Sequence, residues 1–199
     1  MKKKIKLYDS TLRDGAQTRG VNFSLDDKIK IIKILDQIGI DYIEGGWPGA
    51  NPTDDKFFKS LPKLKNSKAV AFGMMRKPGK SAKNDAGLNA VLNSGVSATC
   101  LVGKSSGFQV RNALGVSLNE NLDMIDDTIK YASKRVDEVL FDAEHFFDGY
   151  KHNSKYALTT LKTAFDAGAN WIILCDTNGG TLPYELEEIL SEVKEIIPE

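Results

Sequence analysis

Two adjacent residues near the start of the sequence, Arg13 and Asp14, carry oppositely charged side chains. They follow shortly after an apolar run. A guanidinium supplies fixed positive charge and a carboxylate can hold a divalent ion, so such a pair could stabilise negative charge that develops in a reaction. A salt-bridged arginine–aspartate pair at the end of a strand is also common in protein structures, so this pair alone does not define a site.

Other polar residues follow apolar runs at several later points of the sequence. They are Glu44, Arg76, Lys104, residues 142–145 and residues 176–178. Polar loops are the plain alternative explanation, and they account well for Lys104 taken alone. They account poorly for Asp176-Thr177-Asn178, which stands immediately against an apolar run in a short connection.

The elements that would position these residues alternate along the chain. Short runs of β-forming residues are separated by longer segments of helical periodicity. The expected strands cover residues 5–8, 40–44, 69–73, 98–102, 139–142 and 171–176, and the expected helices cover 24–38, 52–61, 82–93, 119–134, 154–167 and 183–197. Ser24 is the expected N-cap of the first helix, and the isoleucine-rich pattern from Ile29 to Ile38 predicts its buried face. Glycines at 39, 95 and 168 stand where a helix ends and a strand begins, a position that favours a left-handed backbone.

This alternation predicts an α/β fold with a parallel sheet and right-handed crossovers. No Gly-rich phosphate-binding fingerprint follows the first expected strand, which favours a TIM (β/α)8 barrel over a dinucleotide-binding fold. Six βα units in 199 residues make only part of a barrel, since a complete one typically needs about 250 residues. Active sites of such barrels form at the carboxyl ends of the strands, where the polar residues above are expected.

The composition limits the classes of partner. Lys and Arg number 27 together, as do Asp and Glu, so the formal net charge is zero and gives no reason to expect nucleic acid or an anionic membrane. No apolar run approaches the roughly 18 residues of a membrane span, and no signal-peptide core follows the lysines at 2 to 4. Cys100 and Cys175 lie far apart in apolar runs and are expected to be buried free thiols, which indicates a reducing, cytoplasmic compartment.

The sequence YDSTLRDG at residues 8–15 resembles the opening motif of a metal-dependent barrel family that contains isopropylmalate, homocitrate and citramalate synthases and hydroxymethylglutaryl-CoA lyase. The spacing from Gln17 to Lys28 is similar to that of the synthase branch. The resemblance implies that Arg13 polarises the carbonyl of a 2-oxo acid and that Asp14 binds a divalent metal, Mg, Mn or Zn. It also implies that Gln17 lies near the substrate or the thioester.

Three further segments resemble the citramalate synthase branch of that family: YIEGGWPGANP at residues 42–52, DAEHFFDGY at 142–150 and CDTNGGTLP at 175–183. They imply an acyltransferase that joins acetyl-CoA to pyruvate in a Claisen-type reaction, giving citramalate for isoleucine biosynthesis. The alternatives are condensation with another 2-oxo acid, as in isopropylmalate synthases, carbon–carbon cleavage, as in hydroxymethylglutaryl-CoA lyase, and an inactive fragment. The implied partners are a small 2-oxo acid and acetyl-CoA, and the full-length protein is expected to be a homodimer.

Four more residues in these segments are candidates for roles at the site. Glu144, beyond the fifth expected strand, is the preferred acid–base residue, and a structural ion pair is its alternative. Glu44 ends the second expected strand and is either a substrate-contacting general base or a hydrogen-bonded carboxylate of the barrel. Thr177 resembles the family's contact to the substrate carboxylate, with Asn178 in support, although a threonine at a strand–loop junction is also a favourable structural choice.

Histidine could complete a metal site, but the sequence offers few. His145 and His152 are the only two, with an expected Gly149-Tyr150 turn between them, and their spacing is not that of a two-histidine metal site. We expect His145 near the site and His152 at the surface. In the family a His-x-His pair on the seventh strand completes the metal site, and residues 1–199 contain none. The expected organisation is therefore the N-terminal part of a catalytic barrel, without its last two βα units or any C-terminal domain, and inactive alone.

Overall fold

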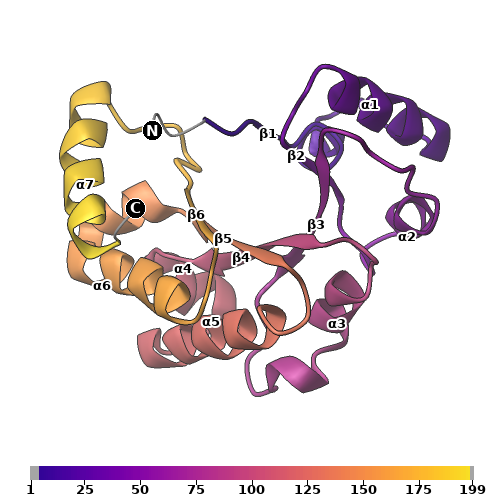
Figure 1. The fold of residues 1–199 in the computed structure, drawn as a ribbon. Coiled ribbons are helices and arrows are strands. Elements are labelled where there is room, and N and C mark those ends of the chain that lie inside the picture. Colours follow the sequence, from indigo (N-terminus) through magenta and orange to yellow (C-terminus); the bar gives the residue numbers. More distant parts are fainter. Residues whose placement is uncertain (1–4, 198–199) are drawn as a thin grey trace. The chain divides into compact units, whose positions relative to one another are not determined.

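The structure is a computed structural model that describes residues 5–197, and its strands alternate with helices along the chain (Figure 1). The strands are β1 (Tyr8–Asp9), β2 (Tyr42–Gly46), β3 (Lys68–Met74), β4 (Ala98–Lys104), β5 (Glu138–Glu144) and β6 (Trp171–Leu174). The α-helices are α1 (Leu25–Gln37), α2 (Pro52–Lys59), α3 (Ala86–Leu92), α4 (Gly107–Gln109), α5 (Leu118–Ala132), α6 (Phe146–Asp166) and α7 (Pro183–Ile196). Short 3-10 or π turns form η1 (Gly15–Gln17), η2 (Ala82–Asn84) and η3 (Val110–Leu114).

The expected α/β class with a parallel sheet is confirmed. The strands are hydrogen-bonded in the order β1-β2-β3-β4-β5-β6. The pairs β1–β2, β2–β3 and β5–β6 are parallel. The three expected glycine joints all have a left-handed backbone, with φ of 85° at Gly39, 87° at Gly95 and 104° at Gly168. Neighbouring strands that follow one another in sequence, with a helix between them, form the succession of βα units that a barrel requires.

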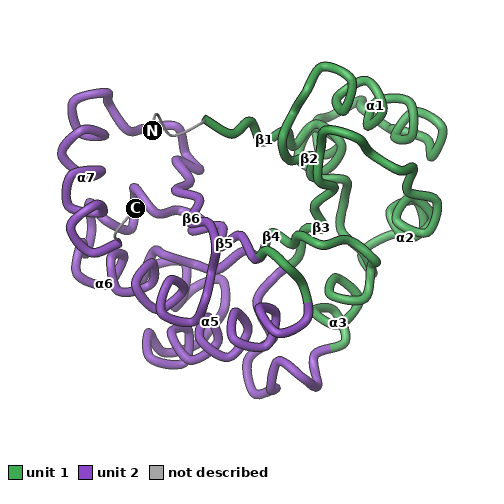
Figure 2. The backbone as a smooth tube through the Cα atoms, viewed as in Figure 1, with its two compact units in different colours: residues 1–73, 86–100, 136–138 green, residues 74–85, 101–135, 139–199 purple. Residues whose placement is uncertain are grey.

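The chain divides into two compact units (Figure 2). The first holds the described residues up to Gly73 together with residues 86–100 and 136–138, and the second holds residues 74–85, 101–135 and those from 139 onwards. Among residues 5–197, no helix combines the length and the apolar character that crossing a bilayer requires.

Helix α1, in the first unit, begins at the expected cap. Ser24 Oγ accepts a hydrogen bond from the backbone N–H of Asp27 at 3.2 Å, and the Asp27 carboxylate accepts one from the backbone N–H of Ser24 at 3.0 Å. This reciprocal arrangement is a capping box. The expected face is confirmed at Ile32, which is fully buried, but Lys28 and Asp36 are also buried and Ile38 is 68% exposed. Ile38 lies two residues beyond Asp36 and therefore faces the opposite side of the helix.

Asp36 anchors the connection that leads into β3. Its carboxylate accepts hydrogen bonds of 2.7 to 3.1 Å from the backbone N–H groups of Lys65, Asn66 and Ser67. Burial alone would raise the pKa of Asp36, but these N–H groups outweigh it and hold the pKa below its usual value. Backbone N–H groups therefore take the place of water around this buried carboxylate, and the hydrogen bonds fix the loop before β3.

Helix α6, in the second unit, consists of two helical segments. The first begins at Phe146 and was not expected, and non-helical backbone at Asn153 separates it from the second, which begins at residue 154 as expected. The Gly149-Tyr150 pair, expected to form a turn, lies inside the helix. A Cβ at Gly149 would lie only 2.4 Å from the carbonyl oxygen of Ser105. The expected turn was wrong because this glycine permits close packing of the helix rather than a change of direction.

Other element bounds differ from expectation by a few residues. Strand β1 begins only at Tyr8, and the helix expected over residues 82–93 is divided into η2 and α3. Strand β6 ends at Leu174 instead of residue 176. Cys100 is a buried cysteine outside any disulfide, as expected, whereas Cys175, which also forms no disulfide, follows the end of β6 and is only half-buried.

Replacing Asp36 with asparagine is expected to destabilise the fold by about 2 kcal/mol near pH 7, because three backbone N–H groups lose a charged acceptor. The pKa of Asp36 is lower in the folded protein than in the unfolded chain. Its contribution is thus present above about pH 4 and is lost as the pH falls through the folded value. Urea unfolding of both proteins across this range measures the gap, which should close at the acidic end.

Asp26→Asn, in the same helix, is the matched control, because Asp26 is exposed. It should change the free energy of unfolding by less than about 0.5 kcal/mol. Equal losses in the two variants, or a gap for Asp36→Asn that does not change with pH, would contradict the role assigned to Asp36.

Candidate active site

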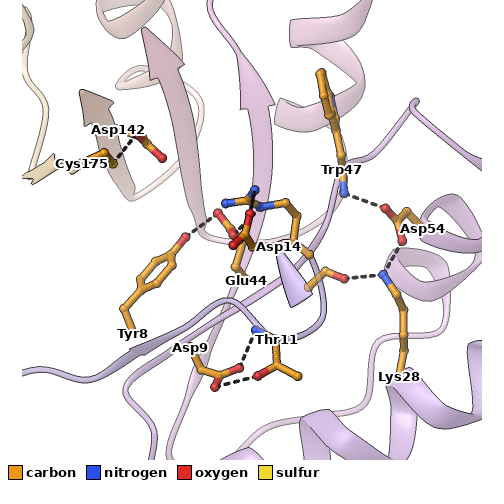
Figure 3. A network of polar contacts seen from close by, with 12 residues as sticks. Tyr8, Asp9, Thr11, Asp14, Lys28, Glu44, Trp47, Asp54, Asp142 and Cys175 are labelled. Carbon is orange, nitrogen blue, oxygen red and sulfur yellow. Dashed lines mark hydrogen bonds and ion pairs between the residues drawn. The ribbon is translucent and has the colours of Figure 1, made fainter. Parts of the chain in front are cut away.

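The candidate catalytic arginine lies in a tight turn that follows β1. The backbone N–H groups of Arg13 and Asp14 both donate to the carbonyl oxygen of Ser10, at 3.1 and 2.8 Å. The carboxylate of Asp9 accepts from the backbone N–H and the hydroxyl of Thr11, at 3.0 and 3.1 Å (Figure 3). The turn therefore presents the Arg13 and Asp14 side chains from a backbone with little freedom.

Three neighbours surround the guanidinium of Arg13. Its Nε donates to Glu44 Oε2 at 2.6 Å, its Nη1 donates to Asp14 Oδ1 at 2.9 Å, and its Cζ lies 3.9 Å from the centre of the Phe72 ring. Burial lowers the pKa of Arg13, but the charge of Glu44 and the hydrogen bond to it, together with Asp14, outweigh burial and raise the pKa above its usual value. Arg13 is thus a permanent cation that keeps N–H donors for a ligand.

Glu44, in β2, has no exposed surface, and both of its carboxylate oxygens accept hydrogen bonds. Oε2 accepts from Arg13, and Oε1 accepts from the phenol of Tyr8 at 2.8 Å (Figure 3). Burial, reinforced by the neighbouring Cys100 and Glu44, raises the pKa of Tyr8 far above its usual value, so the phenol remains a donor. This geometry favours the hydrogen-bonded carboxylate of the two alternatives for Glu44, and a direct contact with substrate stays a prediction.

Asp14, the predicted metal ligand, has a side chain that is 64% exposed and accepts from Arg13. Within residues 5–197, no group of three or more His, Cys, Asp or Glu side chains is placed to hold a metal ion. Divalent cations need several converging ligands. Asp14 alone would be one ligand of such an ion, and its metal role stays a prediction.

A pocket of about 390 Å³ lies beside Arg13 in the first unit. It is lined by the turn after β1, the start of α1 and the β2–α2 connection: Leu12, Arg13, Ala16, Gln17, Asn22, Phe23, Lys28, Trp47, Ala50, Asn51, Thr53 and Asp54. Gln17, predicted to lie near the substrate, is thus placed in the same concavity as Arg13. The contact of Gln17 with the substrate or the thioester stays a prediction.

The buried Lys28 forms an ion pair that connects three elements of the first unit. Its Nζ donates to the carbonyl oxygen of Gly45 at 3.0 Å and pairs with the Asp54 carboxylate. Asp54 also accepts from the backbone N–H of Trp47 at 2.9 Å (Figure 3). Gly46 makes room for this carboxylate, since its φ is 148° and a Cβ would lie 2.6 Å from Asp54 Cγ. The pair therefore fixes the loop that carries Trp47.

In the second unit, Glu144 ends β5 and Lys104 ends β4, and their side chains form an ion pair. The carbonyl oxygen of Glu144 accepts from the backbone N–H of Ser105 at 3.0 Å, which joins the two strand ends. The Glu144 side chain is 28% exposed. Lys104 is therefore a member of an ion pair rather than only a polar loop residue. The ion pair expected as the alternative for Glu144 is present, and its acid–base role stays a prediction.

Arg76, which follows β3, has its charge balanced inside the second unit. Nη1 donates to Glu120 at 3.1 Å, and Nε lies 2.9 Å from the Asp127 carboxylate. The side chain is buried, and the two carboxylates offset its charge there.

Thr177 and Asn178 bind residues that follow β5. Thr177 Oγ1 accepts from the backbone N–H of His145 at 2.9 Å, and Asn178 Nδ2 donates to Asp148 at 2.6 Å. His145 is the one non-glycine residue with a left-handed backbone among those described, with φ of 56°. Because Thr177 Oγ1 already accepts a hydrogen bond, its own hydrogen is left to donate. His152 is exposed, as expected.

The half-buried Cys175 and its neighbour complete the connection after β6. The Cys175 thiol donates to Asp142 Oδ1 at 2.9 Å. The backbone N–H of Thr181, at 3.0 Å, is the main cause that lowers the pKa of Asp176, and Gly180 adds to it. Asp176 therefore shapes the loop that carries Thr177.

Within each unit, the structure brings part of the predicted set together. Sequence reasoning missed the three residues that support it: Tyr8, Phe72 and Asp54. Tyr8 and Phe72 read as ordinary strand residues, and Asp54 as a first-turn helix aspartate, because their partners lie far away in sequence. The complete burial of Glu44 would have indicated that hydrogen-bond donors must lie beside its carboxylate, but burial cannot be read from the sequence.

Two curated proteins match nearly the whole length of the chain. (R)-Citramalate synthase from Aquifex aeolicus is 51% identical over 197 residues, which cover 98% of this chain and 37% of that protein. 2-Isopropylmalate synthase from Staphylococcus saprophyticus is 33% identical, covering 99% of this chain and 37% of that protein. The chain thus spans little more than a third of the length of these relatives.

Among solved structures, hydroxymethylglutaryl-CoA lyase from Pseudomonas aeruginosa matches with a TM-score of 0.80 at 18% identity, covering 98% of this chain and 65% of that one. This likeness concerns the fold, and it confirms the expected partial TIM (β/α)8 barrel. The family model described as HMGL-like matches residues 4–199. With that match over nearly the whole sequence, and half of the residues shared with a synthase, the chain belongs to the HMGL-like family.

Proposed function

We propose that these residues belong to an acyltransferase that condenses acetyl-CoA with pyruvate to give (R)-citramalate and CoA. The observation that carries the proposal is the difference in identity: 51% to the (R)-citramalate synthase against 33% to the 2-isopropylmalate synthase, over nearly the same part of the chain. A barrel lyase shares the fold, but at 18% identity it does not argue for cleavage.

We further propose that residues 1–199 form the N-terminal part of a longer catalytic barrel domain. The 37% coverage of the relatives supports this organisation. The remaining ligands of a divalent metal would then lie outside the described residues, where one carboxylate, Asp14, is available to the ion. Such an ion, when bound, would supply positive charge near the substrate oxygens.

In this proposal Arg13 binds the carbonyl oxygen of the 2-oxo acid. The oxygen becomes an alkoxide when the new carbon–carbon bond forms, and the unused N–H donors of Arg13 stabilise that charge more than they stabilise the ketone. Glu44, itself held by Tyr8, supports this role because it fixes Nε of Arg13, while Asp14 fixes Nη1 and the Nη2 donors are assigned to substrate. Gln17, in the adjoining pocket, is assigned to the substrate or the thioester.

The residues of the second unit receive the remaining roles. Glu144 takes a proton from the methyl group of acetyl-CoA, the resulting enolate attacks C2 of pyruvate, and the alkoxide takes up a proton. Water then hydrolyses the thioester, which releases CoA. The free hydroxyl hydrogen of Thr177 suits it to donate to the pyruvate carboxylate, with Asn178 held nearby by Asp148.

The full-length protein is expected to release free CoA thiol from acetyl-CoA when pyruvate is present. With 2-oxobutanoate or 2-oxoisovalerate the value of kcat/KM should fall by about tenfold or more, since one extra methylene in a fitted pocket changes binding by about 1–3 kcal/mol. A thiol-release assay with each acid is the measurement. Residues 1–199 assayed alone should give no turnover, because their described part lacks a complete metal site. Cleavage of a 3-hydroxyacyl-CoA without any condensation would contradict the proposal.

Arg13→Lys, in the full-length protein, is expected to lower kcat by about 10²–10³ with a smaller change in KM. Lysine keeps the positive charge but lacks the planar set of N–H donors that stabilises the developing alkoxide. Asp14→Asn should differ in kind, since a neutral amide is a poorer metal ligand and excess metal should restore part of its activity. Both variants are compared by kcat and KM across a metal titration. If Arg13→Lys raised KM but left kcat normal, Arg13 would only bind the substrate, and the proposed mechanism would be contradicted.

A further inference from the structure

We infer that Phe72 is a positioning residue for Arg13: the face of its ring fixes the plane of the guanidinium, and with it the plane in which the substrate oxygen must lie. The inference rests on the proposed role of Arg13. It goes beyond the motif that contains the arginine, because Phe72 lies in β3 and the motif ends with the turn after β1.

The hydrogen bonds of Arg13 leave its guanidinium one freedom. Nε is held by Glu44 at 2.6 Å and Nη1 by Asp14 at 2.9 Å, and the N–H bonds that make these contacts lie in the guanidinium plane. Such contacts oppose sliding within the plane. They do not prevent the plane from tilting about the line that joins them, and a tilt would move the Nη2 donors away from the substrate.

Phe72 opposes that tilt. Its ring centre lies 3.9 Å from Cζ of Arg13, which is a stacking distance, and the face of a guanidinium has no hydrogen bond to lose by stacking. The negative face of the ring also attracts the cation. Stacking therefore holds the plane while the in-plane N–H donors stay available to a ligand.

The ring is itself fixed by neighbours in the first unit. Phe72 is 6% exposed, and the Trp47 ring packs against it edge to face, with centres 5.5 Å apart and planes at 79°. Trp47 is anchored through its backbone N–H, which donates to Asp54 at 2.9 Å, and Asp54 pairs with the buried Lys28. This sequence of contacts preorganises the ring before substrate arrives.

The test varies the charge of the ring face while keeping its volume nearly constant. Phenylalanine at 72 is replaced in the full-length protein by its mono-, di- and trifluorinated forms, and separately by leucine. The expected result is a stepwise fall in kcat along the fluorine series and a loss of about tenfold in Phe72→Leu, with KM for pyruvate changed less than about threefold. Phe58→Leu is the matched control, because Phe58 is buried to a similar degree, at 7% exposure, on α2. It should lower stability and leave kcat unchanged.

A second readout does not depend on turnover. Protons of the Arg13 guanidinium that lie over the ring should have upfield-shifted NMR resonances, and the shift should vanish in Phe72→Leu but persist in Phe58→Leu. A flat kcat along the fluorine series, equal kinetic effects of Phe72→Leu and Phe58→Leu, or no such shift would overturn the inference while leaving citramalate synthesis intact. Absence of condensation with the shift present would instead overturn the proposed function, and the kinetic role of Phe72 with it.

Discussion

The carboxylate of Glu44 lies in β2 without any exposed surface, and the arrangement of the candidate site depends on how that charge is satisfied. An isolated buried carboxylate is strongly unfavourable, and removing one partner from a buried pair typically costs about 3–5 kcal/mol. Here Arg13 supplies the opposite charge and Tyr8 a neutral donor. The requirement for both partners fixes the direction in which Arg13 can point. A constraint of folding thus becomes a constraint on where a substrate oxygen can bind.

A second buried charge pair, Lys28 and Asp54, fixes the chain beside the first. Lys28 and Asp54 satisfy each other and also hold the Gly45 carbonyl and the Trp47 N–H, so the β2–α2 connection has one arrangement. Trp47 then packs on Phe72, which lies under Arg13. Arg13 is therefore held along its edge by Glu44 and across its face by Phe72. Polar groups in the interior determine the geometry, while apolar packing keeps them in place.

The sequence predicted the order of strands and helices well because βα alternation and glycine joints are local signals. Gly39 and Gly168 indicate left-handed joints because glycine, which has no Cβ, adopts positive φ without strain. Gly149 misled for the same reason, since a glycine that permits close packing on Ser105 looks identical to one that turns the chain. The motif residues Arg13 and Asp14 could be named in advance. Their supports could not, because Tyr8 and Phe72 resemble any strand aromatic until the sheet brings Tyr8 to Glu44 and Phe72 to Arg13.

The measurement that tests the account most directly is a double-mutant cycle on kcat/KM with Arg13→Ala, Glu44→Gln and the double variant, all in the full-length protein. If Glu44 acts only by orienting Arg13, the double variant should be about as slow as Arg13→Ala alone, with a coupling energy above roughly 1 kcal/mol. If Glu44 is instead a general base with its own contact to substrate, the two losses should multiply. Additive losses would contradict the central claim that the buried carboxylate works through the arginine.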